Sequence, residues 1–298
     1  MKILYSVVLP TYNRAEHLAS CIRSILDQSY KDFELIIVDD GSTDNTHDVI
    51  SRFKDKRIKY IYQENSERGA ARNTGIEVAQ GDYVQFIDSD DTFTPFHLEL
   101  LNHLIKINNR PDIIACNASR KIARELKSYA KYISSDLLII DNQSLLIGNP
   151  FSCNFAIKQN SIRHFFKTSR KLSSMEDWLF LIQNALEDRP IYLLRQQTVK
   201  VGLHANQSMQ NHQKVIGARM DAVAMLDSLG TLNASQMNSV IAHSELFIAI
   251  HHRLNLNLLK SIQSLLKINL INLDQNSRLK YIYTLFLLLP AFLKSLLK

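Results

Sequence analysis

Three carboxylates, Asp88, Asp90 and Asp91, directly follow an apolar run at Tyr83–Ile87. Carboxylates this close repel one another unless a cation or solvent separates them. Hard oxygen ligands on a short loop suit Mg²⁺ or Mn²⁺, which keep open positions for water and phosphate oxygens. Taken alone, the triplet fits a helix-capping turn equally well.

Three other polar clusters have a similar setting. The apolar run Ser6–Leu9 leads into Pro10, Thr11, Tyr12, Asn13 and Arg14. A second run leads into the segment 39–44, which begins with an aspartate pair, and a third cluster at 67–75 carries an arginine and a glycine at the start of a helical pattern. The free amides of a helix N-terminus can face an anion.

The elements between these clusters alternate. We expect strands at 6–9, 33–38, 58–62, 83–87, 113–116 and 154–157, and helices at 15–27, 70–79, 95–107 and 175–186. Such alternation favours an open, mostly parallel sheet with helices on both faces. Ligands of these sheets bind outside the carboxyl ends of the strands, where the polar clusters fall.

The two ends of the chain differ in charge. The chain has 298 residues with a formal charge of +6; residues 205–298 hold nine basic and four acidic side chains, against 26 and 25 in residues 1–204. We therefore expect a turn-rich front domain at 1–205, with halves at 1–118 and 119–205, and a basic helical region at 206–298. The charge favours anionic partners but is too weak to indicate nucleic acid, so no nucleic-acid partner is expected.

Other features exclude some classes of protein. A hydrophobic content of 46% excludes intrinsic disorder. The cysteines Cys21, Cys116 and Cys153 lie far apart, which favours reduced thiols in the cytosol. No secretory signal is visible, and the apolar run 281–293 is too short to span a bilayer.

Taken in order, the four clusters resemble the front half of a glycosyltransferase of family 2, of the bacterial surface-polysaccharide type. The resemblance is close over residues 3–115 and looser over 150–205. It implies the GT-A nucleotide-diphospho-sugar transferase fold, with a mostly parallel sheet flanked by helices, a C-terminal helical appendage and a Mn²⁺ or Mg²⁺ cofactor. The donor implied is a nucleotide diphosphate-sugar, for which we expect a UDP-sugar.

The resemblance also assigns roles to residues. The turn from Pro10 to Arg14 and Asp39 would hold the nucleobase and ribose, and Arg72 would reach the base. Asp88 and Asp90 match the family's Asp-x-Asp motif around Ser89, with Asp90 as direct metal ligand and Asp88 nearer the ribose. Two simpler readings stay open: a capping role for the aspartates at 39 and 40, and a surface pair of Arg72 with Glu67 or Glu77.

A fifth cluster contains Glu176, Asp177 and Trp178 at the expected start of a helix. By the resemblance, Asp177 would be the general base that accepts the acceptor hydroxyl proton in an inverting transfer. The alternative is an acidic first turn favoured by the helix dipole. Trp178, the only tryptophan, is either a stacking platform for a sugar or a core residue.

His204 follows the last strand-like stretch. Some family members carry a histidine there that completes the metal or diphosphate site; a solvent-facing loop histidine is the alternative. His251 and His252, in the middle of a helical stretch, are expected at the surface.

The end of the chain combines apolar helical spacing with six basic residues over 254–298 against the single acid Asp274. Such helices either lie at an anionic membrane surface or pack on the catalytic domain. Membrane contact would suit a lipid-linked glycan acceptor, such as one on undecaprenyl diphosphate, and a cytoplasmic protein at the inner face of the cell membrane.

The function expected is therefore sugar transfer to a glycan hydroxyl. A nucleotidyltransferase is one rival, although the first loop lacks the glycine and lysine that it would need. A catalytically silent scaffold of a glycan-assembly complex is the other.

Overall fold

The computed structural model describes residues 2–119, 137–140, 142–149, 151, 153–185, 189–202 and 210–288. By its internal contacts the chain forms two compact units, which we describe separately. Unit 1 comprises Met1–Asn142, Asn149–Ser169 and Phe180–Ala205. Unit 2 comprises Gln143–Gly148, Arg170–Leu179 and Asn206–Lys298. The division that we expect at residue 205 remains a prediction.

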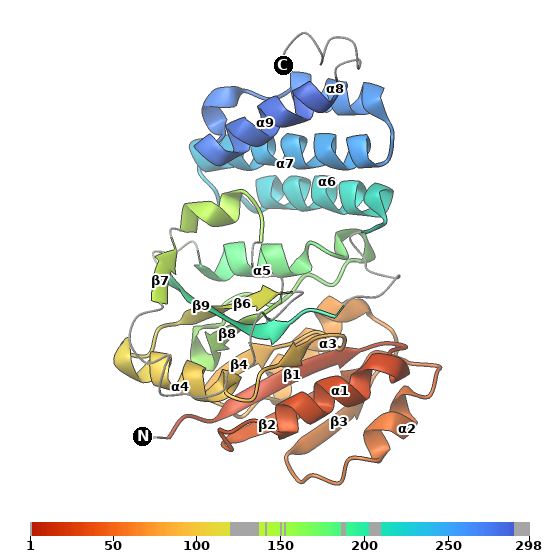
Figure 1. Cartoon of the computed structure of the whole chain (residues 1–298), viewed down its shortest axis with the longest axis vertical. Coiled ribbons are helices and arrows are strands. Elements are labelled where there is room, and N and C mark those ends of the chain that lie inside the picture. The colour runs from red at the N-terminus through yellow and green to blue at the C-terminus, as the bar shows by residue number, and fades with distance from the viewer. Residues whose placement is uncertain are drawn as a thin grey trace. The chain divides into compact units, whose positions relative to one another are not determined.

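Unit 1 contains one sheet, whose strand order is β3-β2-β1-β4-β8-β6-β9-β5, with β7 pairing to β9 (Figure 1). The strands are β1 (Tyr5–Thr11), β2 (Phe33–Asp39), β3 (Ile58–Tyr62), β4 (Tyr83–Phe86), β5 (Thr92–Phe93), β6 (Ile113–Ser119), β7 (Leu137–Ile140), β8 (Phe155–Lys158) and β9 (Ile191–Lys200). The first four in this order are parallel, and β8 runs against both of its neighbours.

Helices flank this sheet. They are α1 (Ala15–Leu26), α2 (Thr46–Ser51), α3 (Glu67–Val78) and α4 (His97–Ile107). A fifth helix, α5 (Glu176–Ala185), begins in unit 2 and ends in unit 1. The fold is thus α/β with a mostly parallel sheet, as the sequence predicts.

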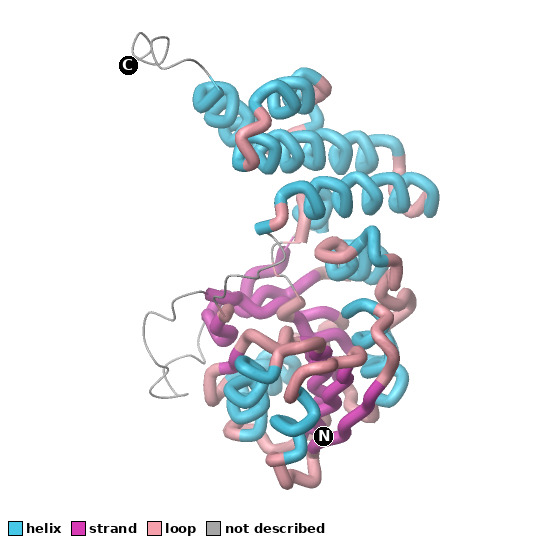
Figure 2. Tube along the Cα trace, turned by 90° about the vertical axis from the view of Figure 1, so that its right-hand side faces the viewer, coloured by secondary structure: helices cyan, strands magenta, loops and turns pink. Residues whose placement is uncertain are grey.

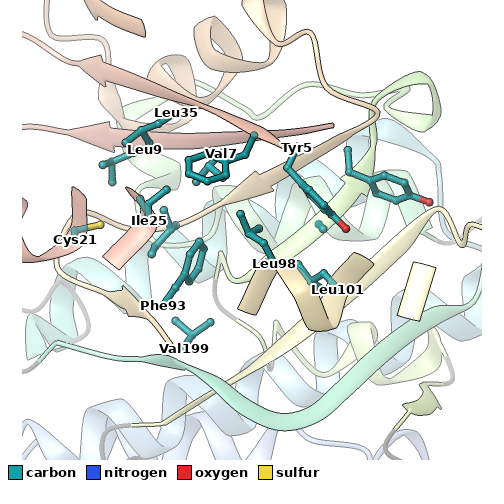
Figure 3. Close-up of a cluster of buried hydrophobic side chains, with 14 of the residues drawn as sticks. Tyr5, Val7, Leu9, Cys21, Ile25, Leu35, Phe93, Leu98, Leu101 and Val199 are labelled. Carbon is teal, nitrogen blue, oxygen red and sulfur yellow. The ribbon is translucent and has the colours of Figure 1, made fainter. Parts of the chain in front are cut away.

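The core of unit 1 lies between β1, β2 and the helices α1 and α4 (Figure 3). All seven residues of β1 are buried, because a central strand covered on both faces has no polar side. Along α1 the buried residues Leu18, Cys21, Ile22 and Ile25 follow helical spacing and form one apolar stripe. Each of the leucine and isoleucine side chains contributes about 1.5–3 kcal/mol on burial.

Helix α3 packs on β1 at close range. A Cβ atom at Gly75 would collide with the side chain of Val8, so this helix needs a glycine where it crosses the strand. The close approach brings the helix to the sheet next to the end of β4, where the acidic loop begins.

Unit 2 is almost wholly helical in its described part (Figure 2). Its elements are α6 (His212–Leu229), α7 (Ala234–Leu254), α8 (Leu258–Leu266) and α9 (Gln275–Leu288), with the short 3₁₀ helices η2 (Asn142–Leu146), η4 (Arg170–Leu172) and η6 (Leu270–Asn272). Asn233 begins α7 with a reciprocal capping box to Gln236. The helical character expected beyond residue 206 is confirmed for the described residues 210–288, and residues 289–298 lie outside them.

Some expectations differ from the structure. The sequence does not predict β5, because a two-residue strand carries no periodic signal. The sequence also predicts no defined strand at 137–140, where β7 pairs antiparallel with β9. His251 is buried rather than exposed, since its ring lies against His212, with 2.9 Å between the two Nδ1 atoms.

Candidate functional site

The loops after β1 and β2 are joined to each other. Thr11 and Asp39 are neighbours in the parallel register, and the Asp40 backbone N–H donates to the Thr11 carbonyl at 2.8 Å. Beyond the strands, the Asn13 side-chain oxygen accepts from the Thr43 N–H at 2.8 Å. Asn13 has φ +50, a left-handed conformation that asparagine tolerates. The predicted turn from Pro10 to Arg14 is thus placed beside the Asp39 loop.

Asp39 and Asp40 have different surroundings. The Asp39 carboxylate is buried and accepts from the Ser42 N–H at 2.9 Å and the Tyr60 hydroxyl at 3.1 Å. Burial, followed by the Asp39 charge, raises the pKa of Tyr60 to about 12. Asp40 instead accepts from the Ser66 N–H at 2.9 Å, directly before α3. Asp40 therefore organises the start of α3, while Asp39 shapes the loop after β2.

Arg72 lies inside unit 1, on α3. Its side chain is 1% exposed, and Nη2 donates to Asp88 Oδ1 at 2.8 Å. The guanidinium also lies 5.2 Å from the centre of the Phe166 ring. Burial alone would raise the pKa of Asp88, but the charges of Arg72, Arg68 and Arg14 outweigh burial and hold it below its usual range. Asp88 is therefore a carboxylate that α3 holds in place, and Arg72 is not a surface residue.

Asp91 closes the acidic loop onto the end of β9. Its backbone N–H donates to the Asp88 carbonyl at 3.0 Å, and its Oδ1 accepts from the Gly202 N–H at 3.1 Å. Burial, followed by the charges of Asp88 and Asp90, raises the pKa of Asp91 to about 8. A Cβ at Gly202 would collide with the Asp90 carbonyl, so only glycine fits here.

These surroundings can be compared with what a divalent cation needs. Among the described residues no group of three or more His, Cys, Asp or Glu converges on one metal position. Asp88 accepts a hydrogen bond from Arg72 and Asp91 accepts one from Gly202, and Asp90, the direct metal ligand expected from the sequence, lies between them in the loop. Mg²⁺ in particular is commonly bound through one or two carboxylates plus substrate phosphates, so the donor set fits a cation that arrives with a diphosphate. His204 lies outside the described residues, and Ser89 is buried within the loop.

The cluster around Asp177 belongs to unit 2. Glu176 is buried, and its Oε2 accepts from the Ser174 N–H at 2.7 Å in the turn before α5. Asp177 Oδ1 lies 2.8 Å from the Trp178 N–H in the first turn. Trp178 is 1% exposed and donates from Nε1 to the Leu145 carbonyl at 2.6 Å, which makes it a core residue rather than an exposed platform.

Solved structures share this fold. One is the crystal structure of Staphylococcus aureus TarS 1–349 in complex with UDP-GlcNAc, with a TM-score of 0.66 and 18% identity, covering 96% of this chain and 80% of that one. Another is the mannosyltransferase PcManGT from Pyrobaculum calidifontis in complex with GDP-Man and Mn²⁺, with a TM-score of 0.64 and 15% identity, covering 96% of this chain and 86% of that one. The architecture is thus that of the GT-A glycosyltransferases.

The sequence places the chain within that class. The model of glycosyl transferase family 2 matches residues 6–166, and the chain belongs to this family. A relative is the putative teichuronic acid biosynthesis glycosyltransferase TuaG of Bacillus subtilis, 46% identical over 101 residues, which are 33% of this chain and 40% of that protein. Among eight curated relatives, the matched region spans from 14% to 63% of their own length.

Sequence reasoning missed two residues that shape these clusters. Gly202 carried no signal of its contact with Asp91, because the two residues are far apart in the chain. The second is Arg219 of α6, which is buried at 2% exposure although helical spacing alone gives no reason to single it out.

Proposed function

We propose that this protein is an inverting, metal-dependent glycosyltransferase that moves a sugar from a nucleotide diphosphate-sugar to a hydroxyl group of a glycan. The observation that carries the proposal is the family match over residues 6–166, which includes all four clusters of unit 1. Relatives named glycosyltransferases, including TuaG, support the transferase activity.

In this proposal the nucleotide binds at the ends of β1 and β2. The turn from Pro10 to Arg14 and the Asp39 loop would hold the nucleobase and ribose, because their hydrogen bonds fix both loops before a ligand arrives. Arg72 would hold the Asp88 carboxylate beside the ribose. Its expected contact with the nucleobase is thereby replaced by an indirect role through Asp88. A UDP-sugar is the donor we favour, since a UDP-GlcNAc complex has the same fold.

The diphosphate would be held at the acidic loop by Asp90, with Asp88 beside it and His204 as a further candidate ligand. When bound there, Mn²⁺ or Mg²⁺ would supply positive charge to the departing diphosphate. The Mn²⁺ complex of PcManGT supports a divalent cation in this fold. Asp91 keeps the loop closed on Gly202 through its hydrogen bond to the Gly202 N–H.

Asp177 would remove the proton of the acceptor hydroxyl as this oxygen attacks the anomeric carbon. The oxygen–carbon bond forms while the bond to the diphosphate breaks on the opposite face, so the configuration inverts. Glu176 fixes the turn that precedes the base through its bond to Ser174. A carboxylate can act here because proton removal accompanies the attack.

Contact with a membrane is a further part of the proposal. Seven large apolar side chains of the α8–α9 region are at least 60% exposed: Leu256, Leu259, Leu266, Ile271, Leu279, Ile282 and Tyr283. The exposed basic side chains of Lys260 and Lys280 lie on α8 and α9 respectively. Within the described residues no helix is long and apolar enough to cross a bilayer. Apolar and basic side chains together suit the surface of an anionic bilayer, where a lipid-linked acceptor would reside.

The catalytic proposal is tested by measuring transfer from a panel of nucleotide sugars with and without Mn²⁺. Asp177→Asn and Asp90→Ala should each reduce transfer at least 100-fold, while Asp48→Asn, an exposed acid of α2, should not. Wild-type transfer by either active-site variant would refute its assigned role. If no nucleotide sugar of the panel raises the unfolding temperature of the protein, the catalytically silent scaffold is favoured.

The membrane proposal is tested by co-sedimentation with vesicles containing anionic phosphatidylglycerol. Leu266→Ser/Ile271→Ser and Lys260→Gln/Lys280→Gln should each weaken binding, and the charge variant should make it less sensitive to salt. Ser51→Asn on α2, in unit 1, is the matched surface control. Unchanged sedimentation of both double variants would contradict the proposal.

A further inference from the structure

Arg219 is a buried cation in unit 2. Its side chain is 2% exposed, and no acidic group pairs with it in the described part of the chain. Burial lowers its pKa to about 9. A buried charge without a counter-ion is costly, so its contacts should have a compensating use.

The contacts of Arg219 join three segments. Nε donates to the Ser244 hydroxyl of α7 at 2.8 Å, and Nη2 donates to the Ile147 carbonyl at 2.8 Å. The guanidinium carbon lies 3.6 Å from the centre of the Trp178 ring, a distance typical of a stacked cation–π contact. Arg219 therefore links α6 and α7 to the segment 143–148 and to the first turn of α5.

Trp178 contacts both Arg219 and the segment 143–148. Its Nε1 donates to the Leu145 carbonyl at 2.6 Å, so the indole ring is fixed at one edge by segment 143–148 and on one face by Arg219. Trp178 follows Asp177 directly in the chain. Because the indole is held at one edge and on one face, the backbone of residue 178 and the adjoining Asp177 are restrained as well.

We infer that Arg219 is a positioning residue, which acts through Trp178 to fix the first turn of α5 and with it the Asp177 carboxylate. The inference rests on the proposed role of Asp177 as general base. By this inference, the helical region after residue 206 would position the catalytic base in addition to its proposed contact with the membrane.

The planar guanidinium is essential to this role. It stacks on the ring and at the same time donates in two directions within its plane, which a lysine ammonium cannot reproduce. Arg219→Lys should therefore retain the charge but lose part of the positioning, and Arg219→Met should lose the charge as well.

The first test is spectroscopic, because Trp178 is the only tryptophan of the chain. In Arg219→Met the Trp178 emission maximum or lifetime should change while the far-ultraviolet circular dichroism stays that of the wild type. His243→Leu is the matched control: it breaks the 3.1 Å contact with Asp274 in the same unit and should leave the emission unchanged. Unchanged emission in folded Arg219→Met, or an equal change in His243→Leu, would refute the stacking.

The second test is kinetic and uses the full chain. Arg219→Met should lower kcat about 10- to 100-fold with the KM for the donor within twofold, because a misplaced base slows the chemical step without altering donor binding. Arg219→Lys should fall between Arg219→Met and the wild type. If Arg219→Met does not fold, Trp178→Phe, which removes the bond to Leu145, should show the same split between kcat and KM.

The outcomes separate this inference from the proposed function. If Asp177→Asn abolishes transfer while Arg219→Met retains wild-type kcat, the positioning role is wrong and the base is right. If Asp177→Asn itself retains transfer, the assignment of the base fails first. A rise in the donor KM that alone accounts for the loss would also overturn the inference.

Discussion

The ion pair between Arg72 and Asp88 should be one of the strongest pairwise interactions in unit 1. The nitrogen and oxygen lie 2.8 Å apart, with Arg72 1% and Asp88 34% exposed. At an effective dielectric constant of about 20, Coulomb's law gives roughly 6 kcal/mol for two charges at this distance. Because solvent reaches a third of Asp88, we expect about half of this, roughly 3 kcal/mol, as the measured coupling.

A double-mutant cycle measures this coupling. The free energy of unfolding in urea at pH 7 is compared for the wild type, Arg72→Met, Asp88→Asn and the double variant. Each single variant removes one partner of the pair and should be destabilised, whereas the double variant should be more stable than the sum of the two losses predicts. The pair Lys2–Asp32, with a distance of 2.6 Å and an exposed lysine, is the control and should couple far more weakly because solvent screens it.

The pH dependence provides an independent check. The folded-state pKa of Asp88 is lowered, so the stability that this carboxylate contributes is fully present above the unfolded-state pKa of about 4. This contribution is lost as the pH falls through the folded-state value. The coupling should therefore be constant near neutrality and decrease in acid. A coupling below about 0.5 kcal/mol at pH 7, or one that rises in acid, would refute the reasoning.

Two further predictions concern positions outside the ion pair. Gly202→Ala should displace the Asp90 carbonyl and raise the Mn²⁺ concentration for half-maximal activity at least tenfold; Gly217→Ala, where a Cβ meets nothing within 4 Å, should leave it unchanged, and equal effects of both would contradict the prediction. Burial lowers the pKa of His97 to about 3, so the unfolded state binds a proton between about pH 6.5 and 3 that the folded state does not. His97 should thus cost about 1.4 kcal/mol of stability for each pH unit of acidification in this window, measurable in urea. In His97→Gln the free energy of unfolding should fall less steeply between about pH 6.5 and 3. An equal pH dependence of this free energy in both proteins would contradict the prediction.

Much of unit 1 is predictable because its signals are local. Val7, Val8 and Leu9 form a continuous apolar run, which is typical of a strand covered on both faces. Leu18, Ile22 and Ile25 repeat at helical spacing. The strands at 6–9, 33–38, 58–62 and 83–87 are confirmed within one or two residues. The acidic loop follows directly, since it starts where the last of these strands ends.

The partners of the candidate site residues were not predictable in the same way. By sequence alone, a pair of Arg72 with an acid on its own helix stayed open, and the packing of α3 on β1 turns it toward Asp88. Trp178 could have been an exposed platform, and its burial under Arg219 depends on a helix that begins more than 30 residues later. Such contacts join distant segments, and spacing along the chain carries no information about them.

The sequence by itself determined the α/β class, the order of the elements and the four polar clusters, because periodicity and strand ends are properties of neighbouring residues. It also carried the family, since the motifs lie in one continuous region. Tertiary structure alone decided which carboxylates are held by other groups: Asp88 by Arg72, Asp91 by Gly202, and Asp39 by Tyr60. The physical reason is that charge and hydrogen bonding act through space, where residues far apart in the chain become neighbours.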